Sequence, residues 1–221
     1  MFVGHYAPGF AIKAVSPKAP MWALLAAVQG IDIVWAVLVP AGIERARIAP
    51  NEALPGMPLV LDFMPYTHSL LGSIVISLAL ALLVGALVRD GDWKMVMWIT
   101  VAGVSHWFLD LLVHQPDLTL YGAPPKLGLS LWAYKWPELA LEIVIVLLGL
   151  GIYRRATEAP SAAGRVALRT VGALLVVVAL VEKTMPPPPS IEQATLSALA
   201  LYVVFILCGL WLDRTRTAMA A

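Results

Sequence analysis

Six apolar stretches, each close to 20 residues long, constrain most strongly how this chain can fold. They lie at residues 21–40, 68–88, 93–113, 137–153, 167–182 and 194–212. A helix of about 20 apolar residues crosses the ~30 Å hydrocarbon layer of a bilayer and satisfies its backbone polar groups internally. The sequence therefore predicts an all-α fold, a polytopic membrane helix bundle of about six transmembrane helices in one domain, 1–221. The alternative is five, because Arg169 stands near the start of the fifth stretch.

Composition supports this class and narrows the partners. Hydrophobic residues make up 60% of the chain and charged residues only 13%, a balance far more apolar than that of soluble domains. The net charge of +1, without a basic run, gives no electrostatic footprint for nucleic acid. A single cysteine, Cys208, excludes an intrachain disulfide. We therefore expect membrane lipid as the surroundings and no nucleic-acid partner.

Lysine and arginine residues beside the predicted spans set the expected orientation. With six spans, one side of the membrane holds both termini and ten of these residues: Lys13, Lys18, Arg89, Lys94, Arg154, Arg155, Arg165, Arg169, Arg214 and Arg216. The other side holds five: Arg45, Arg47, Lys126, Lys135 and Lys183. Because basic residues gather on the cytoplasmic side, both termini are predicted to be cytoplasmic.

The third apolar stretch carries three metal-capable side chains spaced four residues apart. His106, Asp110 and His114 share one face of a helix, since residues four apart stand above one another. Ionisable groups in a transmembrane segment are costly and usually mark a buried site. Imidazole and carboxylate are ligands of zinc, iron and manganese, so the strip predicts a metal site. The alternatives are a buried His106 bonded to a neighbouring helix and a solvated His114 at the interface.

Polar residues of other spans fall at the same depth. From ~1.5 Å of rise per residue, Asp32 lies roughly 16 Å, His106 roughly 20 Å and Asp110 roughly 26 Å from the cytoplasmic end of their spans. His68 opens the second span at the outer side, and Glu142 lies about one turn inside the fourth. Five groups from four spans are therefore expected to meet in the outer half. Glu142 is a candidate ligand or general base, and Asp32 could instead pair with a hydroxyl or a histidine.

At these residues the chain resembles a family of small bacterial inner-membrane proteins named membrane-bound metal-dependent hydrolases. The resemblance runs from Val3 to Arg155 and rests on four motifs: Gly4-His5, Gln29-Gly30-Ile31-Asp32, Tyr66-Thr67-His68-Ser69 and Ser105-His106-Trp107-Phe108-Leu109-Asp110. It implies a bacterial inner-membrane location and a metal site built from His5, Asp32, His68, His106 and Asp110. Some similar proteins are instead labelled permeases.

Two departures from the family pattern affect the expected site. The family often has a pair of aspartates where this chain has only Asp32, and a His-Arg pair where this chain has Asp62-Phe63-Met64-Pro65. These differences favour one metal ion over two, with Asp62 as a substitute ligand or a solvated loop carboxylate. His5 can join the site only if residues 2–16 fold back into the bundle as a short re-entrant segment, which requires burial in protein. Otherwise that segment is interfacial.

Three functions compete at this stage. The first is a hydrolase that uses a divalent metal, with zinc preferred, to cleave a lipid-like or amphiphilic ester or phosphoester near the outer face, with Glu142 or Asp62 as proton acceptor. The second is an ion- or proton-coupled permease that uses Asp32, Asp110 and Glu142. The third is a structural protein whose polar residues fix helix packing. Residues 1–155 are expected to bear the site, and 156–221 to supply two further helices as scaffold or homo-oligomer face.

Overall fold

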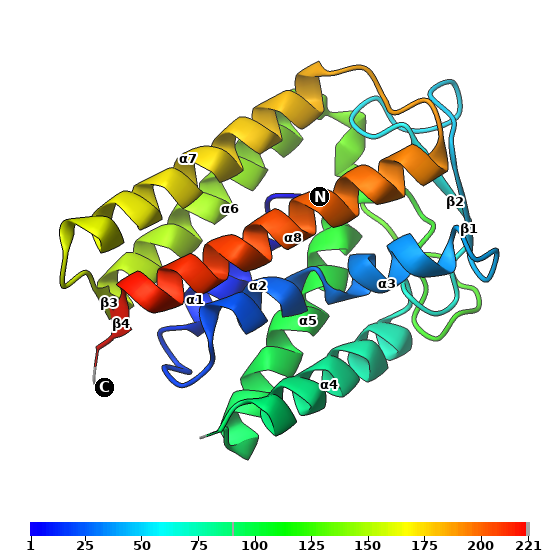
Figure 1. Cartoon of the computed structure of the whole chain (residues 1–221). Coiled ribbons are helices and arrows are strands. Elements are labelled where there is room, and N and C mark those ends of the chain that lie inside the picture. Colours follow the sequence, from blue (N-terminus) through cyan, green and yellow to red (C-terminus); the bar gives the residue numbers. More distant parts are fainter. Residues whose placement is uncertain (90, 220–221) are drawn as a thin grey trace.

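The computed structural model describes residues 1–89 and 91–219 as a bundle of long helices around a short buried one (Figure 1). The helices are α1 (Tyr6–Ile12), α2 (Met21–Val28), α3 (Gly30–Leu38), α4 (Leu70–Leu87), α5 (Trp93–Val113), α6 (Lys135–Ala156), α7 (Ala162–Thr184) and α8 (Ile191–Thr215), with a 3-10 turn at Leu131–Ala133. Two antiparallel strand pairs join β1 (Arg45–Ile48) to β2 (Leu59–Phe63) and β3 (Thr157–Glu158) to β4 (Thr217–Ala218). The Arg-Asp-Gly-Asp sequence at 89–92 predicts a turn between the second and third spans, and Asp90 within it lies outside the described residues.

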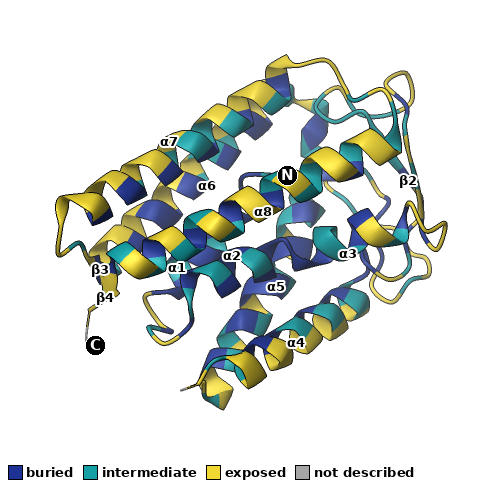
Figure 2. Cartoon of the chain, in the orientation of Figure 1, coloured by how far each residue is buried: buried dark blue, intermediate teal, exposed yellow. Residues whose placement is uncertain are grey.

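Five helices, α4 to α8, are long and apolar enough to cross a membrane, so the all-α membrane bundle is confirmed. The fifth predicted span is among them, because α7 continues through Arg169. Figure 2 shows exposed residues along the outer sides of α4, α7 and α8. On α4 these include Leu71, Val75 and Leu82, each more than half exposed. In a multi-pass membrane protein such a face meets lipid, so its exposure carries no penalty.

The first predicted span is a broken helix rather than a straight one. Helices α2 and α3 meet at Gln29 with a bend of 50°, and they give a sixth crossing if the bent pair is one span. The backbone of Gln29 leaves the helical region there, with φ of −106° and ψ of 4°. Its side-chain amide donates to the carbonyl oxygen of Phe2 at 3.0 Å. This break was not predicted from the sequence, because a buried helix interruption needs hydrogen-bond partners that only the folded chain supplies.

Side-chain caps set the starts of three long helices. The Ser69 hydroxyl accepts a hydrogen bond from the Gly72 amide at 3.1 Å, and Ser190 caps α8 in the same way. Asp92 accepts from the Met95 amide at 2.9 Å and pairs with Lys18 at 3.0 Å. These two bonds, the backbone one first, hold the pKa of the Asp92 carboxyl below its usual range. Such caps satisfy the free amides of a helix's first turn.

The segment before α2 folds back into the bundle, as expected for a re-entrant piece. In α1, Tyr6, Phe10 and three further residues are buried, and the helix lies among α2, α5 and α6. Gly149 of α6 permits this packing, since a Cβ there would stand 2.6 Å from the Ala7 carbonyl oxygen. Figure 2 shows α1 and α2 buried at the centre of the bundle. The fold thus carries His5 to the level of α5.

The position of Met1 differs from the prediction that both chain termini lie on the same side of the bundle. Loop 13–20 lies beside the α4–α5 turn through the Lys18–Asp92 pair, and Lys13 lies 3.8 Å from Asp213 near the end of α8. This end of the bundle therefore holds the loop and the C-terminal strand. Met1 does not lie there, because its amino nitrogen is buried 3.6 Å from Asp110. Helix α1 runs from the level of the site toward that end.

Candidate metal centre

Six side chains that are far apart in the sequence lie together in the bundle. They are His5 before α1, Asp32 on α3, His68 before α4, His106 and Asp110 on α5, and His114 at the end of α5. Five of them are at most 5% exposed, and the Asp32 side chain is 17% exposed. We call these six residues the His–Asp cluster. All four histidines of the chain belong to it.

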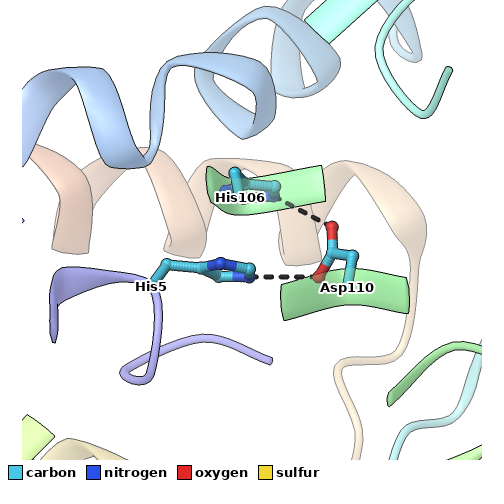
Figure 3. Close-up of side chains that lie close together, drawn as sticks. All are labelled: His5, His106 and Asp110. Carbon is cyan, nitrogen blue, oxygen red and sulfur yellow. Dashed lines mark ion pairs between the residues drawn. The ribbon is translucent and has the colours of Figure 1, made fainter. Parts of the chain in front are cut away.

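Asp110 is at the centre of this cluster. Its Oδ1 lies 3.1 Å from His5 Nε2 and 3.7 Å from His114 Nε2, while its Oδ2 lies 3.0 Å from His106 Nε2. Figure 3 shows the His5 and His106 rings reaching the two oxygens of this carboxylate from different elements. The two rings stack with centroids 3.7 Å apart. Helix α5 thus supplies one carboxylate that several imidazoles share.

Asp32 is the second carboxylate of the cluster. Its Oδ1 lies 3.3 Å from His106 Nε2 and 3.9 Å from His68 Nε2. The hydroxyl of Tyr202, on α8, donates to its Oδ2 at 3.0 Å. Both open alternatives for Asp32, a histidine partner and a hydroxyl partner, are therefore present at the same time. The bend at Gln29 places α3, and with it Asp32, on this side of α5.

Three histidines are held by their Nδ1 atoms. Nδ1 of His106 lies 2.7 Å from the Val28 carbonyl oxygen, and Nδ1 of His114 lies 2.9 Å from Asp117 Oδ1. Nδ1 of His68 lies 2.9 Å from the Thr67 hydroxyl, which itself donates to Glu44 at 2.6 Å. Because carbonyl and carboxylate oxygens only accept, and the Thr67 hydrogen is already given away, each Nδ1 is the donor.

In the neutral imidazole, this arrangement leaves Nε2 of each of the three rings with a lone pair facing the cluster. Metal-bound histidines commonly give their other N–H to a carboxylate or a backbone carbonyl in this manner. Nε2 of His106 and both ring nitrogens of His5 are buried without an aligned hydrogen-bond partner among the described residues. Buried polar atoms of this kind call for an additional partner. A metal ion fits the donor set.

Two sets of three residues can each hold an ion. The first is His5, His106 and Asp110, and the second is His68, Asp110 and His114; in each, one donor atom per residue lies within 4.8 Å of the others. Three protein ligands with one position left for water are typical of catalytic zinc sites. The sets share Asp110, so the geometry offers places for one ion or for two bridged by this carboxylate. The expectation of a single metal rested on the missing second aspartate and did not foresee this sharing.

The structure does not bring Glu142 into either ligand set. Its Oε1 accepts hydrogen bonds from the backbone amides of Phe2 at 2.6 Å and Gly4 at 3.4 Å. Glu142 therefore ties the segment that carries His5 to α6. This contact accounts for a carboxylate at this depth in the fourth span, and the role of Glu142 as proton acceptor stays a prediction.

Asp62 also lies apart from the cluster. It is exposed on β2, where its carboxylate pairs with Arg47 at 3.1 Å. Arg47 also binds Glu52, and this hydrogen bond and charge lower the pKa of the Glu52 carboxyl. Of the two alternatives for Asp62, its position agrees with a solvated carboxylate and not with a substitute ligand in the cluster.

Several residues of the site were missed at the sequence level. Tyr202 comes from α8, in the part of the chain expected to be scaffold, while Asp117 and Glu44 come from loops. The spacing of Asp117, three residues after His114, was a usable signal. Tyr202 and Glu44 offered none, because their partners Asp32 and Thr67 lie 170 and 23 residues away.

A cavity of about 740 Å³ adjoins the cluster. Asp32, His68, Asp110 and His114 line it together with Glu182 and Lys183, and much of the remaining wall comes from α7, α8 and the loops at 50–59 and 185–188. Pockets of 300–1,000 Å³ with a few polar groups are the usual size for small-molecule sites. A ligand in this cavity could therefore reach the histidines.

Comparisons of the chain with protein families, with curated proteins and with solved structures found no match. The chain is a multi-pass membrane protein with a buried His–Asp cluster that could hold a metal ion.

Proposed function

We propose that this protein is a membrane-embedded, metal-dependent hydrolase that cleaves an ester or phosphoester of an amphiphilic substrate near the outer face of the membrane. The observation that carries the proposal is the His–Asp cluster, in which three imidazoles are fixed by Nδ1 bonds and point their Nε2 atoms at shared carboxylates beside a cavity. The resemblance to membrane-bound metal-dependent hydrolases points to the same chemistry.

The ligand set favours a divalent metal such as zinc. Four imidazoles and two carboxylates suit zinc, and the absence of thiolates from the set agrees with a catalytic rather than a thiolate-rich structural site. The bound metal would polarise the scissile oxygen and activate a water molecule for attack. Either His5, His106 and Asp110 or His68, Asp110 and His114 would hold it, and the burial of these residues excludes competing solvent.

Asp32 is the residue we assign as proton acceptor. Its side chain is 17% exposed, against 4% for Asp110, and it lines the cavity, so a water molecule can reach its carboxylate. The Tyr202 hydroxyl orients that carboxylate through Oδ2. A base must lie within hydrogen-bond reach of the proton it removes, and of the three carboxylates considered only Asp32 lines the cavity.

The proposed location follows from the distribution of basic residues. With six spans, ten of the 15 Lys and Arg residues fall on the side of loop 13–20 and the C-terminal strand. Because basic residues gather on the cytoplasmic side of a membrane, we take that end of the bundle as cytoplasmic. The cluster then lies toward the opposite, outer face of a bacterial inner membrane. A substrate held in the outer leaflet would meet the cavity from the bilayer.

Metal analysis of the purified protein tests this function. Detergent-purified wild-type protein is expected to hold near-stoichiometric divalent metal, and His106→Ala to lose it. Ser105→Ala is the matched control, because the Ser105 hydroxyl bonds only the Ala102 carbonyl at 2.6 Å. Wild-type protein that is folded and metal-free after incubation with zinc contradicts the proposal. A metal-loaded protein that moves ions across liposomes without hydrolysing esters would favour the permease instead.

A further inference from the structure

We propose that the cleft between α7 and α8 binds the hydrocarbon chain of the substrate, which enters sideways from the bilayer. This inference rests on the proposed function, because it assigns the two ends of one amphiphile to the two ends of the cavity. The hydrolysable head lies at the His–Asp cluster, and the chain runs outward between the two helices.

Hydrogen bonds join helices α7 and α8 at the end that holds Gly164 and Arg216. The Arg216 guanidinium donates to the Thr157 hydroxyl at 2.9 Å and to the Gly164 carbonyl at 3.2 Å, and the β3–β4 pair closes the same end. Gly164 allows α7 to approach the Thr215 carbonyl closely. Toward the other end the helices diverge, and the segment 185–190 spans the gap (Figure 1).

The cavity occupies this divergence. Val178 and Val181 of α7 line it on one side, and Ala194, Ala198 and Leu201 of α8 line it on the other. The three α8 residues follow helical spacing of four and three, so they share one face. Val181 remains 49% exposed although it lines the cavity, which shows that the cavity opens at the surface between the helices. That surface faces lipid in a membrane.

The chemistry of this wall fits a hydrocarbon chain. Between the helices it presents the aliphatic or small side chains of Val177, Val178, Val181, Ala194, Ala198 and Leu201, while Glu182, Lys183, Gln193 and Tyr202 add polar groups to the lining. A chain that moves from lipid onto the aliphatic part exchanges one apolar environment for another. A water-soluble substrate would instead have to cross the lipid-facing opening. Asp32, His68, Asp110 and His114 of the cluster line the same cavity, so a polar head group finds its binding partners there.

Ala198 lines the cavity and is not a member of the His–Asp cluster, so a larger side chain there can block the proposed site for the hydrocarbon chain of the substrate. Phenylalanine there fills the cleft, whereas Leu196→Phe is the matched control, because Leu196 is 70% exposed and does not line the cavity. The probes are n-dodecyl phosphate and n-butyl phosphate, titrated calorimetrically into zinc-loaded protein in lipid nanodiscs. Titration into empty nanodiscs corrects for partitioning into lipid.

We expect Ala198→Phe to raise the Kd for dodecyl phosphate at least tenfold and to leave that for butyl phosphate within twofold. Leu196→Phe is expected to leave both within twofold. Equal effects of the two variants on dodecyl phosphate, or equal losses of both phosphates in Ala198→Phe, would overturn the chain site. Ala194→Phe, one turn earlier, repeats the test if Ala198→Phe fails to fold.

A second measurement separates this inference from the proposed function. An alkyl phosphate with a diazirine at the end of its chain is photolysed with wild-type protein, and the labelled residues are mapped by mass spectrometry. Labelling concentrated on Val178, Val181, Ala194 and Ala198 supports the chain site, even in protein found to hold no metal. Labelling spread over the lipid faces of α4 and α5 in metal-loaded protein overturns the chain site and leaves the metal centre standing.

Discussion

Two buried groups of charged residues lie side by side in this bundle, and they satisfy their charges differently. The His–Asp cluster has two carboxylates among four imidazoles, and the Met1 amino nitrogen stands 3.6 Å from one of them. The second group, which we call the Glu–Lys cluster, consists of Glu138 and Glu142 on α6 and Glu182 and Lys183 on α7. There Lys183 Nζ lies 2.8 Å from Glu138 and 4.0 Å from Glu182, and it donates to the Gly56 carbonyl at 3.3 Å.

The way in which the carboxylates are neutralised indicates which of the two clusters can bind a metal ion. The Glu–Lys cluster contains its own cation, and Glu142 binds backbone amides, so its groups fasten α6, α7, the loop at Gly56 and the N-terminal segment to one another. The His–Asp cluster instead presents lone pairs of Nε2 toward carboxylate oxygens. A buried carboxylate needs a cation or a proton, and imidazole lone pairs favour the cation.

Removal of the internal cation should have the largest effect. Lys183→Met leaves Glu138 buried without its partner, and a broken buried ion pair costs about 3–5 kcal/mol. We expect this loss in the free energy of unfolding, measured by denaturant titration in mixed micelles. The double variant Glu138→Gln/Lys183→Met should recover most of it. An unchanged stability of Lys183→Met would break the comparison between the clusters.

Loss of the shared carboxylate should remove the metal but not the fold. Asp110 belongs to both ligand sets, so Asp110→Asn is expected to weaken zinc binding at least 100-fold, by ~2.7 kcal/mol. Metal content and competition with a chromogenic chelator measure the effect. Asp62→Asn is the control, because Asp62 pairs with Arg47 outside the cluster. Asp110→Asn protein with full metal content would show that the ligands lie elsewhere.

Two glycines on α6 provide a matched test of the re-entrant segment. A Cβ at Gly149 meets the Ala7 backbone at 2.6 Å, whereas one at Gly151 meets nothing within 4 Å. Gly149→Ala should cost about 1–3 kcal/mol as overpacking and weaken metal binding, because α1 and His5 must shift. Gly151→Ala should stabilise α6 by up to ~1 kcal/mol with metal affinity unchanged. Thermal unfolding and zinc titration of both variants check this. Equal metal affinity in the two variants would show that His5 is not a ligand.

The contribution of α8 to the site should be the smallest effect. Tyr202→Phe removes the hydrogen bond that orients the Asp32 carboxylate, the assigned proton acceptor. We expect about 10-fold lower esterase activity, or ~1.4 kcal/mol in the activation free energy, with zinc affinity and the fold retained. A phenylalanine variant with unchanged activity but weakened zinc binding would assign Asp32 to the metal ligands instead.

Prediction from sequence was strongest where the signal was local. The spans α4 to α8 and the shared face of His106 and Asp110 follow from composition or helical spacing within a few residues. Prediction was weakest where the contacts of a side chain depend on a segment far away in the sequence. Glu142 was expected at the site on depth alone, but the amides of Phe2 and Gly4 take its carboxylate. The position of a residue along its helix predicts its depth in the membrane, but it does not predict which neighbours its side chain contacts.

The sequence by itself determined a multi-span helical bundle with polar groups in one half, because hydrocarbon length and the cost of burying charge act on each segment separately. Tertiary structure alone decided that the helix breaks at Gln29, that His106 bonds the Val28 carbonyl, and that Tyr202 reaches Asp32. It also decided that two ligand sets share Asp110. These features depend on how helices pack and bend, and packing is a property of all the segments together.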